Sequence, residues 1–424
     1  MLPGDLLHLP DDASAAFAAS VASLASRLGA AQAGSGPAVE VLEGAEPGTF
    51  TVTTPTGAGH GTAAVVRTSG STGTPKRTAL PAASLAASAA ATRTYLGGDG
   101  HWLLALPLHY VAGLAVVSRA LLGGTRLATL DLTRHFAPAD FAAATESLRH
   151  AVGPSERLYT SLVPTQLTRL VQDPDPAVRS ALLEYSAILV GGGRAPDATR
   201  AAAREAGLAV VLTYGSAETC GGCVYDGAAL PGVSVRSVDG RLRLGGPMVA
   251  AGYLGDPERT AEHFVTDADA VRWYITDDLG QVSEDGTVSV SGRTDDVINT
   301  GGVKVSAQEV QRVIESVDGV QEAFVAGVAH RDWVETVAVA LVVRPELRST
   351  GPGPDLGPDA DAELVRDIRA AVLTQLGRAA VPTIFSTESE LPRLSNGKPD
   401  RVRIINRLRS AAGEVPVGQE TSQD

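Results

Sequence analysis

The chain has 424 residues, of which 44% are apolar, and a formal net charge of −13. This length suffices for two or three folded domains, and the apolar fraction excludes an intrinsically disordered chain. The negative charge argues against nucleic acid or an anionic membrane as the main partner, because both select basic surfaces. No apolar run reaches the roughly 20 residues that span a bilayer, and the N-terminus lacks the pattern of a signal peptide. We therefore expect a soluble cytoplasmic protein.

The two cysteines of the chain form a C-G-G-C pattern at Cys220 and Cys223. This spacing is typical of redox motifs and of one half of a zinc site. A structural zinc site needs four ligands, and the sequence has no second cysteine pair. Two small residues that line a turn are therefore the favoured interpretation, and a disulfide framework is excluded.

The first 60 residues are rich in Ala and Gly, and residues 14–28 have the spacing of an amphipathic helix. From residue 63 to residue 215, short apolar runs alternate with Ala-rich segments that are long enough for helices. This alternation indicates βα units around a mostly parallel sheet. The expected strands are 63–67, 102–106, 157–160, 187–190 and 209–213, and the expected helices are 79–94, 137–150 and 195–206.

Residues 223–292 have a different pattern, in which short alternating runs are separated by D-G and E-D-G turns. D-G between such runs is a strong hairpin signal, so we expect an antiparallel β subdomain here. The residues after Gly292-Arg293 predict a small α+β domain. Its expected elements are a helix at 306–316, strands at 322–328 and 336–343, a loop at 349–360, a helix near 362–376 and a strand around 382–387, followed by a disordered tail from Ala411.

The segment T-S-G-S-T-G-T-P-K, residues 68–76, combines hydroxyl groups with glycines that let backbone N–H groups approach a ligand. Such concave backbone segments bind anions, and Lys76 adds a positive charge. The P-loop pattern differs, because its Gly-Lys pair opens a helix directly. A flexible Ser/Gly linker is the alternative, but the segment follows a buried-looking strand and precedes a helical segment. We therefore expect a phosphate site, whose phosphate the loop alone does not identify.

The segment T-Y-G-S-A-E-T, residues 213–219, begins on the last residue of an expected strand. Ligands of open α/β sheets bind beyond the carboxyl ends of the strands. At that place Tyr214 could stack on a base, Glu218 could hold Mg²⁺ and Thr219 could contact a phosphate. The alternative is an ordinary strand–turn–helix connection with a capping residue.

Three further motifs lie at 274–280 (Y-I-T-D-D-L-G), at 292–306 (G-R-T-D-D-V-I-N-T-G-G-V-K-V-S) and at 391–401 (L-P-R-L-S-N-G-K-P-D-R). Each could be an ordinary turn when it is considered alone. In this order and composition, all five motifs together resemble the adenylate-forming superfamily of acyl-CoA synthetases, peptide synthetase adenylation domains and luciferases. The resemblance covers roughly residues 60–410.

The resemblance implies the α/β fold of adenylate-forming enzymes, with a large N-terminal domain and a small mobile α+β C-terminal domain. The large domain would combine parallel-sheet α/β layers with the antiparallel β subdomain. Its N-terminus would be truncated, because the phosphate loop begins at residue 68. The implied domains are 1–293 for the ATP and acyl sites and 294–410 for the rotating domain, with 411–424 as the tail.

Three segments narrow the resemblance to the o-succinylbenzoate–CoA ligases of menaquinone synthesis, in their short actinobacterial form. They are A-L-P-L-H-Y-V-A-G-L at 105–114, L-V-G-G-G-R-A-P at 189–196 and Y-G-S-A-E-T-C-G-G-C-V-Y-D-G at 214–227. The implied activity is an acid–thiol ligase that uses ATP, Mg²⁺ and coenzyme A, with small-molecule substrates. A homodimer stays open, as does a CoA ligase for a different acid.

A carrier-loading enzyme or a degenerate adenylate-binding protein is a further alternative. The resemblance argues against degeneracy, because the lysine and the hinge that the family uses are both present. Lys398 matches the lysine that bridges the acyl carboxylate and the α-phosphate, and Asp295 matches the hinge. Gly301, Gly302 and Val303 would line the pantetheine channel.

The resemblance also implies an ATP site. The phosphate loop would contact the β- and γ-phosphates, the Gly191–Gly193 turn and Tyr214 would enclose adenine, and Asp278 and Arg293 would reach the ribose. Glu218 and Thr219 would lie near the α-phosphate, with Glu218 on the metal. The expected ATP-binding residues are Thr68, Ser69, Gly70, Ser71, Thr72, Gly73, Thr74, Lys76, Gly192, Gly193, Tyr214, Gly215, Asp278 and Arg293.

The candidates for the acyl pocket follow from the same resemblance. Tyr110 occupies the position at which many relatives have a gating histidine, since this chain has the order His109-Tyr110. A dicarboxylate substrate also needs a cation for its second carboxylate, and Arg194 is a candidate, although a surface position is the favoured interpretation. The candidate acyl-pocket residues are His109, Tyr110, Gly113, Ser161, Gly192, Cys220 and Gly221.

Overall fold

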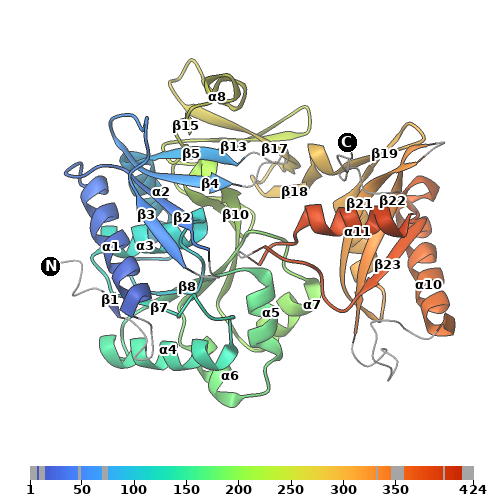
Figure 1. The fold of residues 1–424 in the computed structure, drawn as a ribbon, viewed down its shortest axis with the longest axis horizontal. Helices are drawn as coiled ribbons and strands as arrows, with labels where there is room; N and C mark the ends of the chain where they lie inside the picture. Colours follow the sequence, from blue (N-terminus) through green and yellow to red (C-terminus); the bar gives the residue numbers. More distant parts are fainter. Residues whose placement is uncertain are drawn as a thin grey trace, which may run out of the picture. The chain divides into compact units, whose positions relative to one another are not determined.

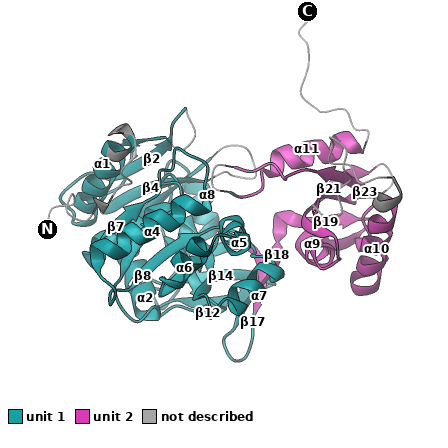
Figure 2. Cartoon of the chain, turned by 90° about the horizontal axis from the view of Figure 1, so that it is seen from below, with its two compact units in different colours: residues 1–276, 282–289, 395–397 teal, residues 277–281, 290–394, 398–424 magenta. Residues whose placement is uncertain are grey.

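The computed structural model of the chain separates into two compact units (Figure 2). Unit 1 contains residues 1–276, 282–289 and 395–397, and unit 2 contains residues 277–281, 290–394 and 398–424. The residues that the structure describes are 7–8, 15–45, 49–68, 75–330, 333–344, 358–394 and 397–412. None of the described helices is long and apolar enough to cross a membrane.

The main sheet of unit 1 has eight strands in the order β1-β7-β6-β8-β9-β10-β11-β12. Its strands β1, β7, β8 and β10 are labelled in Figure 1. The strands from β1 to β10 are parallel, and β11 and β12 add an antiparallel edge. The prediction of a mostly parallel sheet is confirmed. The strands are β1 Leu7–His8, β6 His101–Leu104, β7 Leu127–Thr129, β8 Leu158–Leu162, β9 Ala187–Val190, β10 Val210–Ser216, β11 Gly221–Tyr225 and β12 Ala228–Ala229.

Apolar cores lie on both faces of this sheet, as expected when helices cover a parallel sheet on each side. Leu85 of α2 and Leu114 of α3 contribute to one core, while Phe141 of α4 and Leu167 of α5 contribute to the other. The helix predicted from residue 14 is present, whereas α3, α5 and α6 were not predicted. The helices are α1 Ala15–Gln32, α2 Ala82–Tyr95, α3 Val111–Gly123, α4 Pro138–Val152, α5 Pro164–Gln172, α6 Pro176–Leu183 and α7 Asp197–Glu205.

A second sheet of unit 1, in the order β15-β5-β4-β2-β3, corrects one prediction. The strand predicted at 63–67 belongs to this sheet rather than to the parallel one, and the expected phosphate loop joins two antiparallel strands instead of a strand and a helix. Residues 78–80 are buried in β5, so sheet pairing overrides their helix propensity. The strands are β2 Val39–Glu43, β3 Phe50–Thr53, β4 Thr62–Thr68, β5 Lys76–Pro81 and β15 Gly252–Tyr253.

The predicted antiparallel subdomain forms a third sheet, in the order β13-β14-β17-β16 with β18 on β17. Asp239 and Gly240, with φ angles of 52° and 78°, make the tight turn between β13 and β14 that the D-G dipeptide predicts. The elements are β13 Ser234–Val238, β14 Arg241–Gly245, α8 Pro257–His263, β16 Phe264–Thr266, β17 Arg272–Val282 and β18 Val288–Arg293.

Unit 2 contains a five-stranded sheet in the order β20-β19-β22-β21, with β23 on β22. Val310 of α9 and Ile368 of α10 pack into one core, and Ile404 and Leu408 of α11 pack into another. The predicted α+β character is confirmed, although α10 begins earlier than residue 362 and α11 was not predicted. The elements are β19 Val297–Thr300, β20 Val303–Ser306, α9 Ala307–Glu315, β21 Val320–His330, β22 Val334–Val343, α10 Pro358–Leu376, β23 Ile384–Glu388 and α11 Arg401–Ala411.

Two predicted irregular segments fall partly outside the described residues. Residues 349–357 of the expected loop are among those the structure does not describe, and Pro358 already belongs to α10. The expected tail begins at Ala411, which is the last residue of α11, and residues 413–424 also lie outside the described part.

Candidate active site

The turn after β10 places Glu218 and Thr219 at the carboxyl edge of the main sheet. The strand continues to Ser216, beyond the predicted end at residue 213, and a single 3-10 turn covers Ala217–Thr219. The Thr219 hydroxyl is fully buried, accepts from the Ser216 N–H at 3.0 Å and donates to the Gly221 carbonyl at 2.8 Å. The hydroxyl thus stabilises this turn, and its contact with a phosphate stays a prediction.

The Glu218 carboxylate is buried and has no basic partner in the described part of the chain. Glu218 is only 5% exposed, and the Tyr253 hydroxyl donates to the Glu218 Oε1 at 2.9 Å. No Lys, Arg or His among the described residues lies within ion-pair distance of this carboxylate. Burial, with the neighbouring charge of Glu218, raises the pKa of Tyr253, so its hydroxyl is a donor at neutral pH. A buried carboxylate in this state favours the approach of a cation.

The donor set around Glu218 fits a magnesium ion that substrate phosphates help to hold. Mg²⁺ typically takes one or two protein carboxylates, together with phosphate oxygens and water. The described residues contain no cluster of three or more His, Cys, Asp or Glu side chains that could hold a metal alone. Glu218 is therefore compatible with a metal that arrives with a nucleotide.

The expected phosphate loop begins and ends on a strand pair. Thr68 at the end of β4 lies opposite Lys76 at the start of β5. The Lys76 ammonium lies 5.3 Å from the centroid of the Tyr253 ring. Residues Ser69, Gly70, Ser71, Thr72, Gly73 and Thr74 are outside the described residues.

Three charged side chains fix the strands beside this loop. Arg67 and Arg77 are cross-strand neighbours, and Glu40 of β2 accepts from the Nε atom of each at 3.0 Å. Burial alone would raise the pKa of Glu40, but hydrogen bonds from the two guanidinium groups and their charges hold it below its usual value. The Glu40 carboxylate thus reduces the repulsion between the two like charges where β4 and β5 meet the loop.

The Gly191–Gly193 turn and Tyr214 lie at the same edge of the main sheet, because β9 and β10 are adjacent parallel strands. A Cβ at Gly191 would lie 2.3 Å from the Thr213 Oγ1, so this position must be glycine. A Cβ at Gly215 would similarly lie 2.2 Å from the Gly221 carbonyl. Gly192 and Gly193 are exposed and Tyr214 is half-buried, so the turn and the tyrosine are both partly accessible to solvent.

His109 and Tyr110 precede α3 and contact each other. Their ring centroids are 4.2 Å apart, and His109 Nε2 lies 3.7 Å from a Glu43 carboxylate oxygen. Burial lowers the pKa of His109 despite the attraction of Glu43, so the ring is neutral at pH 7. A Cβ at Gly113 would lie 2.4 Å from the Pro107 carbonyl, so glycine lets α3 start against this segment.

The remaining candidates for the acyl pocket lie on the main sheet and its turn. Ser161 of β8 is 7% exposed and pairs with Leu104 and Leu189 on the neighbouring strands. Cys220 follows the 3-10 turn with a φ angle of 53° and is fully buried. The structure thus brings Ser161 and Cys220 into the same unit as His109, and their role in acyl binding stays a prediction.

The two cysteines are free, buried thiols. Burial raises the pKa of Cys223 to about 12 and also raises that of Cys220. Reactive and metal-binding cysteines are thiolates, so thiols in this state favour neither redox nor zinc chemistry. Only Cys220 lies on the turn, because Cys223 belongs to β11.

The sequence interpretation did not identify Arg119 of α3 as a candidate. This residue is only 9% exposed, and its guanidinium lies 5.5 Å from the centroid of the Trp102 ring. One terminal nitrogen donates to the Tyr225 hydroxyl at 3.3 Å, while Nε has no hydrogen-bond partner among the described residues. The signal was present in the sequence, because Arg119 is the one charged residue in the apolar helix V-A-G-L-A-V-V-S-R-A-L-L-G.

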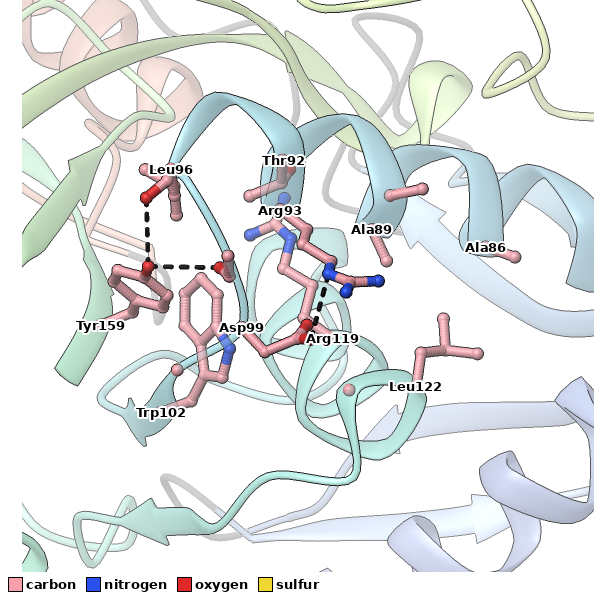
Figure 3. Close-up of a pocket in the computed structure, with 14 residues that line it drawn as sticks. Ala86, Ala89, Thr92, Arg93, Leu96, Asp99, Trp102, Arg119, Leu122 and Tyr159 are labelled. Atoms are coloured by element: carbon pink, nitrogen blue, oxygen red, sulfur yellow. Dashed lines mark hydrogen bonds and ion pairs between the residues drawn. The ribbon is translucent and has the colours of Figure 1, made fainter. Parts of the chain in front are cut away.

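Arg119 borders a cavity of about 190 Å³ between α2 and α3 (Figure 3). Trp102 and Tyr159 line it together with alanines of α2. A terminal nitrogen of Arg119 also comes within 3.8 Å of the position that a Cβ would take at Gly221, beside the turn that carries Glu218. Arg194, by contrast, is exposed and pairs with Asp197 at 2.8 Å, which confirms its surface position.

In unit 2, Arg293 connects three acidic side chains. Its guanidinium donates to Asp295 at 2.8 Å and to Asp278 at 3.1 Å, and it lies 3.7 Å from Asp277. Asp277 and Asp278 belong to the long strand β17, so the motif at 274–280 is not a surface turn. Burial alone would raise the pKa of Asp295, but the hydrogen bond and charge of Arg293 hold it below its usual value.

The other candidates of unit 2 lie on exposed turns. Gly301 and Gly302, with φ angles of 58° and 85°, form the two-residue turn between β19 and β20, and Val303 follows it with half of its surface exposed. Lys398 is exposed, and its carbonyl accepts from the Leu394 N–H at 2.9 Å. The hairpin and the lysine are thus accessible for contact with a ligand.

Comparison with family models gives two matches. The model described as AMP-binding enzyme matches residues 12–254, and the model described as AMP-binding enzyme C-terminal domain matches residues 309–398. Together these matches include elements of both units.

Among curated proteins, the chain is 36% identical over 358 residues to a probable 2-succinylbenzoate–CoA ligase from Mycobacterium tuberculosis, over 83% of this chain and 85% of the relative. It is 29% identical to a sulfoacetate–CoA ligase from Cupriavidus necator, over 81% of this chain and 67% of the relative. These two relatives act on different acids.

Two solved structures show the same fold. ATP-bound MatB from Rhodopseudomonas palustris has a TM-score of 0.68 and 26% identity, over 83% of this chain and 69% of MatB. The o-succinylbenzoate CoA synthetase from Bacillus subtilis, in complex with its acyl-adenylate intermediate, has a TM-score of 0.64 and 25% identity, over 84% of this chain and 70% of the synthetase.

Proposed function

This chain belongs to the AMP-binding enzyme family, and we propose that it ligates o-succinylbenzoate to coenzyme A through an acyl-adenylate. ATP would be converted into AMP and pyrophosphate, and the product would serve menaquinone synthesis. The 36% identity to the mycobacterial ligase along most of both chains supports the choice of acid. The reaction would take place in the cytoplasm, where ATP and coenzyme A are available, with small molecules as its substrates.

The observation that carries the proposal is the pair of buried charges in unit 1. One carboxylate of the substrate would attack the α-phosphorus of ATP, and the second carboxylate would need a cation. Arg119 is a buried cation with no carboxylate partner among the described residues, close to Gly221 of the expected acyl pocket. Since an unpaired buried charge is costly, a dianionic acid that brings its counter-ion explains this arginine.

The adenylation step needs positioning and charge neutralisation more than acid–base chemistry. The attacking carboxylate is already ionised at neutral pH, so no general base is required. We propose that Lys398 neutralises the charge shared by this carboxylate and the α-phosphate, and that the 68–76 loop holds the departing pyrophosphate. Mg²⁺ bound beside Glu218 would offset further negative charge on the phosphates.

The nucleotide would lie along the edge where the main sheet ends. We propose that the Gly191–Gly193 turn and Tyr214 enclose adenine, because a flat half-exposed ring stands beside an exposed glycine turn. Asp278 would accept from the ribose hydroxyls, and Arg293, which donates to Asp278 at 3.1 Å, would hold this carboxylate in place.

We propose the boundary between the two domains after Arg293, with 1–293 as the ATP and acyl domain and 294–410 as the domain that rotates. Asp295 would be the hinge between adenylation and thioester formation. The Gly301-Gly302-Val303 turn would then line the pantetheine channel, for which two glycines with positive φ provide a narrow backbone.

The alternative function is a CoA ligase for another acid, and the similarity to the sulfoacetate–CoA ligase from Cupriavidus necator supports it. The deciding experiment is coenzyme A thioester formation by the purified full chain with o-succinylbenzoate, benzoate, sulfoacetate and a short fatty acid. We expect the highest kcat/KM with o-succinylbenzoate. Activity with one of the other acids, but none with o-succinylbenzoate, would replace the proposed substrate and retain the reaction class.

A further inference from the structure

Tyr253 joins two groups that come from distant parts of the chain. It lies on β15, which pairs with β5 so that Tyr253 is opposite Thr78, two residues after Lys76. One edge of the ring reaches Glu218 through the hydroxyl at 2.9 Å, and the face of the ring lies 5.3 Å from the Lys76 ammonium. A single aromatic side chain therefore contacts both the buried carboxylate and the lysine that ends the phosphate loop.

The surroundings of Tyr253 leave the ring little freedom. It is 5% exposed and packs edge-on against Phe264, with ring centroids 5.3 Å apart. Its N–H donates to the Thr260 hydroxyl at 2.9 Å. A backbone hydrogen bond also joins this segment to the turn that carries Glu218, because the Ala250 N–H donates to the Glu218 carbonyl at 2.9 Å. A rigid donor of this kind can hold a carboxylate in one orientation.

We propose that Tyr253 is a positioning residue that holds the Glu218 carboxylate and the Lys76 ammonium in one relation for binding of the metal–ATP complex. The proposal rests on the proposed function, in which Glu218 takes the metal and the loop takes the phosphates. The hydroxyl leaves the second oxygen of Glu218 for the cation. The ring face attracts the ammonium group, as aromatic faces attract cations generally.

Two variants separate the hydroxyl from the ring. Tyr253→Phe removes the hydroxyl that donates to Glu218 and also interacts with Tyr274, while Tyr253→Leu also removes the ring beneath Lys76. Tyr185→Phe is the matched control, because Tyr185 is also buried in unit 1 and its hydroxyl bonds to Thr145 at 2.7 Å and to no other described residue. The two Tyr→Phe variants each lose one buried hydroxyl, so a general loss of stability affects these two alike.

The measurement is the dissociation constant of ATP by titration calorimetry on the full chain, with and without Mg²⁺ and without any acid. We expect Tyr253→Phe to weaken binding of the magnesium complex about 10-fold and to leave binding of metal-free ATP unchanged, as for the loss of one hydrogen bond to a charged group. Tyr253→Leu should weaken both. Tyr185→Phe should change neither.

The proposal is overturned if Tyr253→Phe keeps the wild-type ratio between the two dissociation constants, or if Tyr185→Phe changes this ratio equally. ATP–pyrophosphate exchange that depends on o-succinylbenzoate provides the second readout, in which Tyr253→Phe should raise the Mg²⁺ concentration for half-maximal rate more than it lowers kcat. A wild-type chain that binds the magnesium complex but shows no such exchange would contradict the proposed substrate and leave the role of Tyr253 intact.

Discussion

Two buried charges of unit 1 differ from the charged cluster around Arg293 in unit 2. In unit 1, Glu218 and Arg119 are buried and no side chain of opposite charge among the described residues neutralises either of them. In unit 2, Arg293 is paired with Asp278 and Asp295. A charge that is neutralised within the chain contributes to folding, whereas a buried charge that lacks a partner indicates a ligand. Under the proposed function, recognition of the metal and of the acid would therefore belong to unit 1.

The signs of the two unit 1 charges match the two kinds of ligand. A carboxylate without a cation suits the metal that accompanies ATP, and a guanidinium without an anion suits a dicarboxylic acid. The desolvation cost of each charge is several kcal/mol when it stays unpaired. Such a cost is tolerated where the ligand removes it, so these two residues are stronger functional candidates than any exposed ion pair of the chain.

The variant with the largest expected effect tests whether the reaction depends on buried charges alone. Lys398 is exposed in unit 2, and we predict that Lys398→Ala lowers the adenylation rate about 1,000-fold, because a positioned charge in the transition state is lost. Thioester formation from supplied acyl-adenylate should be largely spared. Single-turnover measurement of each step would show the difference.

The matched control for this variant is Arg366→Ala, since Arg366 is an exposed cation of the same unit on α10, 70% exposed, with no proposed role in the reaction. Equal loss in adenylation and thioester formation would contradict the role of Lys398. An unchanged adenylation rate would indicate that the buried charges of unit 1, rather than Lys398, act in adenylation.

The next effect concerns Arg119. Replacement by Met keeps the length and apolar packing of the side chain, and we predict a decrease of about 100-fold in kcat/KM for o-succinylbenzoate, as expected when a charged hydrogen-bond partner is lost. Benzoate, which has no second carboxylate, should be used with little change. The melting temperature of the free protein should not fall, because the variant removes a buried charge that has no internal counter-ion.

Arg194→Met is the control for Arg119, because Arg194 is an exposed cation already paired with Asp197. A large loss of thermal stability in Arg119→Met would indicate that Arg119 is a structural residue. Equal loss of activity with both acids would show that the arginine does not read the second carboxylate.

The sequence predicted most of the fold, because its signals were local. The D-G turn at Asp239-Gly240 and the alternation of apolar runs along the main sheet depend on backbone preferences that act within a few residues. The strand Lys76–Pro81 was missed for the opposite reason. Its alanine and leucine favour a helix, and only pairing with β4 and β15 makes it a strand.

The candidate site was predicted unevenly, again for a physical reason. Glu218 belongs to a motif, so its place was predictable. Its burial and its hydrogen bond with Tyr253 depend on β15, because Tyr253 lies 35 positions further along the chain. Arg119 has no motif, and its significance lies in the absence of a counter-ion within the described part of the chain, which only the packing reveals. Motifs therefore lead to predictions for the nucleotide site more readily than for the acyl pocket.

A smaller effect should come from Glu40, a buried charge of unit 1 that does have internal partners. Glu40→Gln leaves Arg67 and Arg77 facing each other, and we predict a loss of about 2 kcal/mol in the free energy of unfolding, since the two arginines are partly exposed and screened. Urea denaturation at pH 7 would measure it. Glu146→Gln, at a carboxylate that is 77% exposed, should have no such effect.

The pH dependence of the Glu40 effect follows from the sign of its pKa shift. The pKa of Glu40 is lowered in the folded protein, so its contribution is fully present above the ordinary glutamate pKa and is lost as the pH falls through the lowered value. The difference between wild type and Glu40→Gln should therefore shrink below about pH 4.5. A difference that stays constant down to pH 3 would contradict the ion-pair explanation.

The smallest expected effect is that of Asp295→Asn in unit 2. Asp295 is 35% exposed and Arg293 is 42% exposed, so solvent screens their pair, and we predict a loss of only about 0.5 kcal/mol in the free energy of unfolding. This contribution should also disappear as the pH falls through the lowered pKa of Asp295. Glu363→Gln, at an exposed ion pair on α10, is the control.

Asp295→Asn separates a hinge role from a structural role, because the two roles predict different effects on stability and on the rates of the two reaction steps. Arg293 retains Asp278 at 3.1 Å after the substitution, so the local fold should persist. A hinge role for Asp295 predicts that thioester formation slows while adenylation and stability change little, because only the step that needs rotation is affected. A loss of 2 kcal/mol or more with both steps slowed equally would instead make Asp295 a structural residue, and the paired charges of unit 2 would then contribute as much to folding as Glu40 does in unit 1.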